Sequence, residues 1–110
     1  MNWKDLTSIE ELENILQESH QHPVAIFKHS TRCSISSTAK NRLERGWNFE
    51  SNQVTPYFLD LIAHRNVSNA IADQLGVVHQ SPQLIVIKNG KAVYDASHMT
   101  IYVDDITEVL

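Results

Sequence analysis

Residues 24–36 read VAIFKHSTRCSIS, an apolar run that passes through a short polar loop into a segment of small polar residues. The run follows a break at His22-Pro23, and its nearly continuous apolar character predicts a short, buried central strand. From Cys33 to about Glu44 there is no glycine or proline, and apolar side chains recur at helical spacing at Ile35, Ala39 and Leu43. Gly46 can end this helix. The stretch therefore predicts a strand, a loop and a helix that begins at Cys33.

Helices and strands are predicted to alternate on both sides of this stretch. Upstream, residues 6–19 (LTSIEELENILQES) contain a capping-box pattern, in which Ser8 is followed three residues later by Glu11. Apolar residues then recur at helical spacing, so a first helix with one apolar face is expected. Downstream, residues 55–61 (TPYFLDL) predict a second strand.

A third helix is expected in residues 66–77 (NVSNAIADQLGV). Its predicted cap lies near Asn66 or Ser68, and Gly76 closes it. The predicted order of elements up to this point is helix, strand, helix, strand and helix.

A hairpin is predicted in residues 81–96 (SPQLIVIKNGKAVYDA), where the turn signal Asn89-Gly90 separates two strands. Residues 101–110 predict a terminal helix. Strands linked by helical crossovers and followed by a hairpin form an α/β fold: a four-stranded mixed sheet with helices on both faces. We expect one domain that spans residues 1–110.

Composition limits the class of protein. The chain has 110 residues, 42% of them hydrophobic and 20% charged, which is typical of a globular domain. Its net charge is −4, and its 9 lysines and arginines are scattered, so neither nucleic acid nor a membrane surface is an expected partner. No signal sequence or membrane-spanning run is seen, and the single cysteine rules out an internal disulfide. We therefore expect a cytoplasmic protein.

Cys33 is the strongest candidate for chemistry. A thiol in the first turn of a helix meets unpaired backbone N–H groups and the positive end of the helix dipole, and both favour the thiolate. Lys28, His29 and Arg32 lie just upstream, and Arg32 is the cation best placed to add positive potential. Ser36 occupies the position of the second cysteine in a Cys-x-x-Cys motif, and we expect its hydroxyl to donate a hydrogen bond to the sulfur. The thiol can attack a disulfide but cannot resolve the product.

An unreactive thiol is the alternative interpretation of Cys33, because free cysteines are often small buried hydrophobes. The polar loop that leads into a helix start favours a reactive thiol. His20, His22, His64 and His79 show no recognised spacing of metal ligands, so no metal site is predicted.

The order of elements resembles the thioredoxin fold, and two stretches carry this likeness: residues 27–36 (FKHSTRCSIS) and 59–93 (LDLIAHRNVSNAIADQLGVVHQSPQLIVIKNGKAV). More narrowly, they resemble the YtxJ-type monothiol bacilliredoxins, whose typical motif is Thr-Cys-Pro-Ile-Ser. This chain departs from that motif, because Ser34 stands where many relatives have proline and Arg32 separates Thr31 from the cysteine.

Two site features are implied by the resemblance. Pro82 is expected to be a cis proline that faces Cys33; because it has no N–H, an extended partner backbone would pair with Ser81 instead. Thioredoxins commonly keep a buried acid six residues before the first cysteine, where it serves proton transfer to the resolving thiol. Phe27 occupies that position here, which agrees with one-thiol chemistry.

The resemblance implies a thiol-disulfide oxidoreductase that removes bacillithiol, or a similar small thiol, from protein mixed disulfides through Cys33. The expected partners are S-bacillithiolated client proteins and the small thiol itself. Bacillithiol would be a co-substrate, with no permanently bound cofactor. Its malate carboxylates would suit nearby cations, and hydroxyl and backbone groups would complete its site. The residues expected to contact the thiol or client are Lys28, Thr31, Arg32, Lys40, Ser81 and Pro82.

Two other functions remain open from the residues. The Cys-x-x-Ser pattern is compatible with an iron-sulfur carrier of the monothiol-glutaredoxin type, in which one protein cysteine and one small thiol hold the cluster in a dimer. Against this, Ser34-Ile35 follow the cysteine, where such glutaredoxins have Gly-Phe. A redox-inert binding module with a thioredoxin fold is the other possibility.

Overall fold

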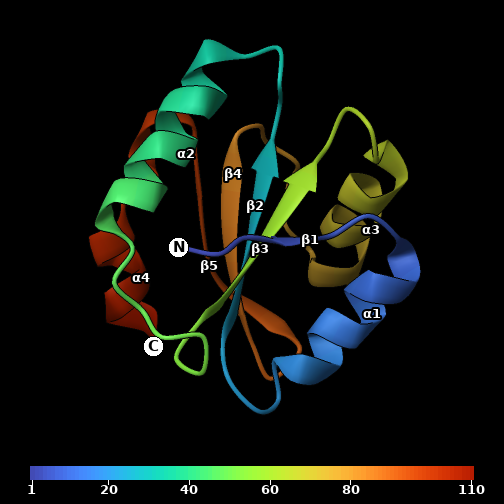
Figure 1. Ribbon diagram of the computed structural model, residues 1–110. Helices are drawn as coiled ribbons and strands as arrows, with labels where there is room; N and C mark the ends of the chain where they lie inside the picture. Colours follow the sequence, from blue (N-terminus) through green and yellow to red (C-terminus); the bar gives the residue numbers. More distant parts are fainter.

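A mixed five-stranded sheet runs through the centre of the computed structural model, which describes residues 1–110 (Figure 1). The strand order is β1-β3-β2-β4-β5. β3 is parallel to both β1 and β2, whereas β4 is antiparallel to β2 and to β5. The elements in chain order are β1 (Lys4–Asp5), α1 (Ile9–Glu18), β2 (Val24–His29), α2 (Ser34–Gly46), β3 (Thr55–Asp60), α3 (Arg65–Leu75), β4 (Gln83–Lys88), β5 (Lys91–Ser97), the 3-10 helix η1 (His98–Thr100) and α4 (Val103–Val109).

The prediction of a four-stranded sheet was wrong by one strand. The additional strand, β1, has two residues, and it pairs with Tyr57 and Phe58 of β3 at the edge of the sheet. Its residues Lys4 and Asp5 are charged and exposed, so they carry none of the apolar alternation by which a strand is recognised. Only the hydrogen bonds to β3 make this segment a strand.

Helices cover both faces of the sheet, as predicted. In Figure 1, α1 and α3 lie on one side of the sheet and α2 and α4 on the other. The side chains of β2 alternate between two apolar cores: Val24 and Ile26 belong to the core beneath α1 and α3, whereas Ala25 and Phe27 belong to the core beneath α2 and α4. All four are fully buried, so β2 is the central strand that the sequence predicts.

The predicted ends of the elements agree closely with the structure. Helix α2 begins at Ser34 with Cys33 as its N-cap, and α3 begins at Arg65, one residue before the predicted range. Gly76 closes α3 in a left-handed conformation with φ of 66°. The terminal helix is shorter than expected, because Ile101 and Tyr102 are extended and α4 begins only at Val103. None of the helices combines the length and the apolar composition needed to cross a membrane.

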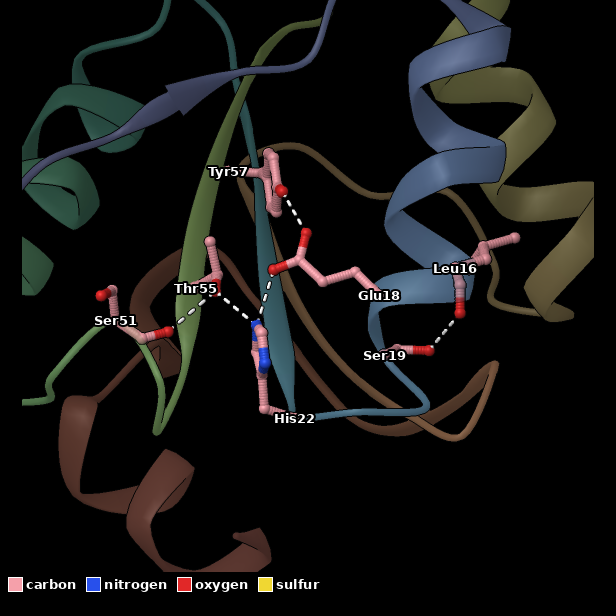
Figure 2. A network of polar contacts seen from close by, with 7 residues as sticks. All are labelled: Leu16, Glu18, Ser19, His22, Ser51, Thr55 and Tyr57. Carbon is pink, nitrogen blue, oxygen red and sulfur yellow. Dashed lines mark hydrogen bonds and ion pairs between the residues drawn. The ribbon is translucent and has the colours of Figure 1, made fainter.

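A network of polar contacts ties the end of α1 to β3 (Figure 2). The hydroxyl of Tyr57 donates a hydrogen bond to Oε1 of Glu18, and the Nε2 atom of His22 lies 2.7 Å from the other carboxylate oxygen. The same Nε2 atom lies 2.9 Å from Oγ1 of Thr55, whose hydroxyl donates to the carbonyl of Ser51. The network lies at the end of β2 opposite to Cys33, so it supports the fold rather than the site.

The charge of Glu18 is stabilised by these contacts. Burial alone would raise the pKa of this carboxyl, but the hydrogen bonds from Tyr57 and His22 outweigh it and hold the pKa below its usual 4.5. A carboxyl whose pKa is lowered on folding stabilises the protein above its unfolded-state pKa, and this stabilisation is lost as the pH falls through the folded-state value.

Tyr57→Phe tests this network, because it keeps the ring and removes only the hydroxyl. We expect the free energy of unfolding to fall by about 1.5–3 kcal/mol near neutral pH, the usual cost of losing a hydrogen bond to a charged group. The difference from wild type should shrink below pH 4.5, as Glu18 takes up a proton. Urea unfolding curves at a series of pH values measure both effects.

Tyr102→Phe is the matched control. Tyr102 is 48% exposed, and its ring lies 4.7 Å from the Arg42 guanidinium, a contact that phenylalanine retains. This change should alter stability by less than about 0.5 kcal/mol. An equal loss in both variants, or a Tyr57→Phe loss that does not depend on pH, would contradict the role given to Glu18.

Candidate active site

Cys33 lies at the junction between the central strand and the helix that follows it. β2 ends at His29, and a turn closes when the N–H of Cys33 donates to the carbonyl of Ser30 at 3.2 Å. Cys33 has extended backbone angles, φ −119° and ψ 119°, and its carbonyl accepts from the N–H of Ser37 at 3.3 Å. The residue is thus the N-cap of α2, with a free and half-buried thiol.

The start of α2 is a suitable place for a negative charge. The first N–H groups of any helix lack an acceptor within the helix, and here the N-cap side chain makes no capping hydrogen bond. The first turn contains no acidic residue that would compete for these groups. The helix dipole and the unpaired N–H groups therefore favour an anion at this end, such as an anionic ligand.

Ser36 has a different role from the one expected. Its hydroxyl accepts a hydrogen bond from the N–H of Ser30 at 3.0 Å and lies 2.6 Å from Nδ1 of His29, and the residue is fully buried. The structure shows no hydrogen bond between this hydroxyl and the sulfur of Cys33. Ser36 instead joins the end of β2, the loop and the first turn of α2, so it fixes the shape of the loop that carries the cysteine.

The His29 side chain lies in an aromatic and apolar environment. Its ring centroid is 5.9 Å from that of Phe27 and 5.3 Å from that of Phe58. Burial, assisted by the nearby Lys40 ammonium, lowers the pKa of His29, although Asp60 opposes this shift. Because the neutral imidazole is favoured, His29 does not supply the positive potential considered for it. Phe27, six residues before Cys33, is fully buried, and its ring is stacked on that of Trp3. An apolar ring therefore occupies the position at which thioredoxins commonly have a buried acid.

Ser81 and Pro82 precede β4 at the end of the sheet where Cys33 lies. The peptide bond between them is cis, which confirms the cis geometry expected for Pro82. In the antiparallel pairing of β2 with β4, Lys28 stands opposite Gln83, so Pro82 reaches the same end of the sheet as the loop before Cys33. The carbonyl of Pro82 accepts from the N–H of His98 at 3.0 Å, whereas the hydroxyl of Ser81 is buried without a partner.

Lys28 is not where a substrate-binding residue would be. Its side chain is fully buried on the face of β2 beneath α1 and α3, and its ammonium donates to the carbonyl of Ser68 at 3.3 Å. Nζ also lies 3.2 Å from Nδ1 of His79. Lys28 was expected to contact the small thiol because it is a cation just upstream of Cys33, but strand alternation turns its side chain into the core beneath α1 and α3.

The other predicted contacts are divided between free and engaged side chains. Thr31 and Arg32 are exposed in the loop before Cys33, where a ligand can reach them. Lys40 is half-buried: it forms an ion pair with Glu44 at 3.1 Å and lies 5.8 Å from the ring centroid of Phe58. No three His, Cys, Asp or Glu side chains converge to hold a metal ion.

Two contacts of the Lys28 ammonium could not be predicted from the sequence. His79 is exposed, as predicted, and Ser68 lies in the first turns of α3, near the predicted helix cap; both contact Lys28. Ser68 is 40 positions and His79 is 51 positions from Lys28 along the chain, so no local pattern links them. The only available signal was a lysine inside a strand predicted to be buried.

Comparisons with known proteins agree with this geometry. The family model described as monothiol bacilliredoxin BrxC matches residues 4–106. A solved protein described as a candidate oxidoreductase with a thioredoxin fold is 30% identical, with a TM-score of 0.82, and the match covers 96% of this chain and 90% of that one. Thioredoxin from Trypanosoma brucei brucei is 18% identical, with a TM-score of 0.75 over 97% of this chain and 92% of its own, which shows similarity of fold alone.

Ser36→Ala tests whether this hydroxyl supports the loop. The change leaves the Ser30 N–H and Nδ1 of His29 without their partner, so we expect the free energy of unfolding to fall by about 1–3 kcal/mol. Ser37→Ala is the matched control, because Ser37 is exposed in the same helical turn and the two changes share the same gain in helix propensity. Guanidinium unfolding curves of both variants should differ; equal stability would contradict the role given to Ser36.

Proposed function

Because this chain belongs to the monothiol bacilliredoxin family, we propose that it removes bacillithiol from protein mixed disulfides by thiol-disulfide exchange at Cys33. The observation that carries the proposal is the position of the only cysteine: it caps α2 and lies at the same end of the sheet as the cis Ser81-Pro82 bond. A thioredoxin fold with one cysteine at this position supports exchange that stops at a mixed disulfide.

The proposed reaction has two steps. In the first, the Cys33 thiolate attacks the bacillithiol sulfur of the mixed disulfide; a bond forms between these two sulfurs, and the client cysteine leaves as a thiolate that takes a proton from solvent. In the second, the thiolate of another bacillithiol attacks the bacillithiol sulfur now bound to Cys33. This step releases bacillithiol disulfide and restores the Cys33 thiolate. In the net reaction one bacillithiol thiol is oxidised and one client thiol is regenerated, because the other sulfur of the released disulfide came from the mixed disulfide.

Ser36 explains why a second molecule is needed. With an oxygen at this position, the chain holds no thiol that could displace bacillithiol from Cys33. The hydroxyl is also fully buried and bonded to Ser30, so it is part of the framework of the site. Regeneration must therefore use an external thiol or reductant, and a reducing compartment such as the cytoplasm would supply it.

Recognition of the small thiol is proposed to use groups around the sulfur. Arg32 and the unpaired N–H groups at the start of α2 would attract the malate carboxylates. Ser81 has a buried hydroxyl without a partner, and a ligand beside Pro82 would satisfy it. Thr31 is exposed and offers a further hydroxyl. Lys28 is excluded from direct contact because its ammonium is buried.

No cavity encloses the thiol. The cavities of the chain have volumes of about 150, 190 and 220 Å³, and Cys33 lines none of them. The reactive end of α2 is therefore an open surface, which suits a disulfide presented on another protein.

The exchange at Cys33 is tested with a reporter protein that carries one mixed disulfide with bacillithiol. We expect wild-type protein to release reduced reporter and to gain one bacillithiol on Cys33, both visible by intact mass spectrometry. Cys33→Ser should reduce reporter release to the uncatalysed rate, because the nucleophile is lost. Ser37→Ala should behave as wild type, since that side chain is exposed and lies outside the site.

The contrary outcomes identify the other functions. Folded wild-type protein that gains no adduct and releases no reporter would refute the proposal and favour a redox-inert binding module. Anaerobically purified protein that is brown, and that loses its visible absorbance in Cys33→Ser, would instead favour an iron-sulfur carrier.

A further inference from the structure

Lys28 is a buried cation with no carboxylate bonded to it. Its side chain is fully buried, and the partners of its ammonium are the carbonyl of Ser68 at 3.3 Å and Nδ1 of His79 at 3.2 Å. Burial of a charge without an opposite charge is costly, and a methionine or leucine would fill a strand position at lower cost. The ammonium therefore needs an explanation beyond packing.

The partners of Lys28 come from three separate parts of the fold. Lys28 itself lies near the end of β2, Ser68 lies in the first turns of α3, and His79 lies in the loop between α3 and β4. The hydroxyl of Ser68 also lies 3.3 Å from Nδ1 of His79. We call these three residues the Lys28 latch, because they join the loop to the strand and the helix beneath it.

The loop held by the Lys28 latch, residues 77–82, leads into β4 at the end of the sheet where Cys33 lies. It ends in Ser81 and Pro82, which lie at the same end of the sheet as Cys33. Its other internal contacts come from Gln83, which donates to the carbonyl of Val78 at 3.1 Å and accepts from the N–H of Gln80 at 3.4 Å. Those contacts hold the loop to its own continuation in β4. Val77, at the start of the loop, packs in the core beneath α1 and α3, so the latch is the polar side-chain link of the rest of the loop to β2 and α3.

We propose that Lys28 is a positioning residue for the exchange at Cys33: its buried ammonium holds the loop of Ser81 and Pro82 through His79, and protonation of His79 releases that loop. The role in exchange rests on the proposed function, whereas the hold on the loop does not. The hydrogen bond requires that Nδ1 of His79 carries no proton, because the ammonium has only donors. A protonated imidazole would place a second positive charge 3.2 Å from Nζ.

The charges around His79 agree with a release in acid. Burial, the Lys28 ammonium and the Arg65 guanidinium on α3 all lower the pKa of His79 from 6.5. Burial also lowers the pKa of Lys28, to about 8, so the cation faces a neutral imidazole at neutral pH. No carboxylate is bonded to either group. The Lys28 latch is therefore closed near neutral pH and opens as the pH falls through the lowered pKa of His79.

Variants of His79 test the Lys28 latch without disturbing the core. His79→Asn can place its side-chain oxygen near the position of Nδ1, so it keeps an acceptor that does not titrate, whereas His79→Leu removes the acceptor. Lys28→Met removes the donor and retains the length of the side chain. His20→Asn is the control, because His20 is exposed in the segment before β2, at the opposite end of that strand from Cys33. Circular dichroism at each pH verifies that every variant is folded.

Two measurements are made from about pH 7.5 to about pH 4.5, a range that brackets the usual pKa of histidine. The first is amide hydrogen exchange of residues 77–81. The second is the KM and kcat for a peptide that carries a mixed disulfide with bacillithiol. At neutral pH, Lys28→Met and His79→Leu should lose loop protection and raise KM about tenfold with kcat little changed, as expected when one hydrogen bond to a charged group is lost. His79→Asn should match wild type there.

The measurements in acid separate the titration of His79 from other effects of pH on the reaction. As the pH falls, the amides of the loop should lose protection and KM should rise in wild type and in His20→Asn. In His79→Asn, loop protection and KM should both stay near the values measured at neutral pH. If His79→Asn follows wild type, or if Lys28→Met keeps normal protection and KM at neutral pH, the proposal is overturned. If loop protection changes as expected but neither wild type nor any variant reacts with the peptide, the hold of the Lys28 latch on the loop is supported and the proposed function is refuted.

Discussion

The antiparallel pairing of β2 with β4 is the constraint on which the site depends. In this register Lys28 stands opposite Gln83, so the chain leaves β2 toward Cys33 at the point where it enters β4 through Ser81 and Pro82. A shift of one residue would turn the side chains of one of the two strands to the wrong core and would change which residues of β4 stand opposite the end of β2. The apolar residues of these strands are fully buried, and their burial holds the register.

β2 supports two loops at this end of the sheet through its two faces. On one face, His29 lies beside Ser36 and closes the loop that carries the cysteine. On the other face, Lys28 reaches beneath the loop of Ser81 and Pro82 through His79. Adjacent residues of a strand point in opposite directions, so the end of β2 can support the nucleophile and the surface that faces it at the same time. The polar residues at this end are framework groups, and the groups open to a ligand lie in the loops.

Much of the fold follows from local patterns, and most errors concern residues whose partners are distant. The capping box of α1, the turn at Asn89-Gly90 and the glycine that closes α3 were recognised from neighbouring residues, since such signals act within a few positions. β1 gave no signal, because its two charged residues become a strand only through β3. Ser36 was assigned to the sulfur from its spacing, but the hydroxyl turns to Ser30 and His29.

The sequence by itself determined that one thiol lies at the start of a helix after a buried strand, because apolar periodicity and the absence of a second cysteine are both visible in the order of residues. Tertiary structure alone decided what surrounds that thiol. It paired Lys28 with His79, left the hydroxyl of Ser81 without a partner and bonded Ser36 to the loop. The physical reason is that a side chain's partner depends on strand register and packing between distant segments, which no local pattern encodes.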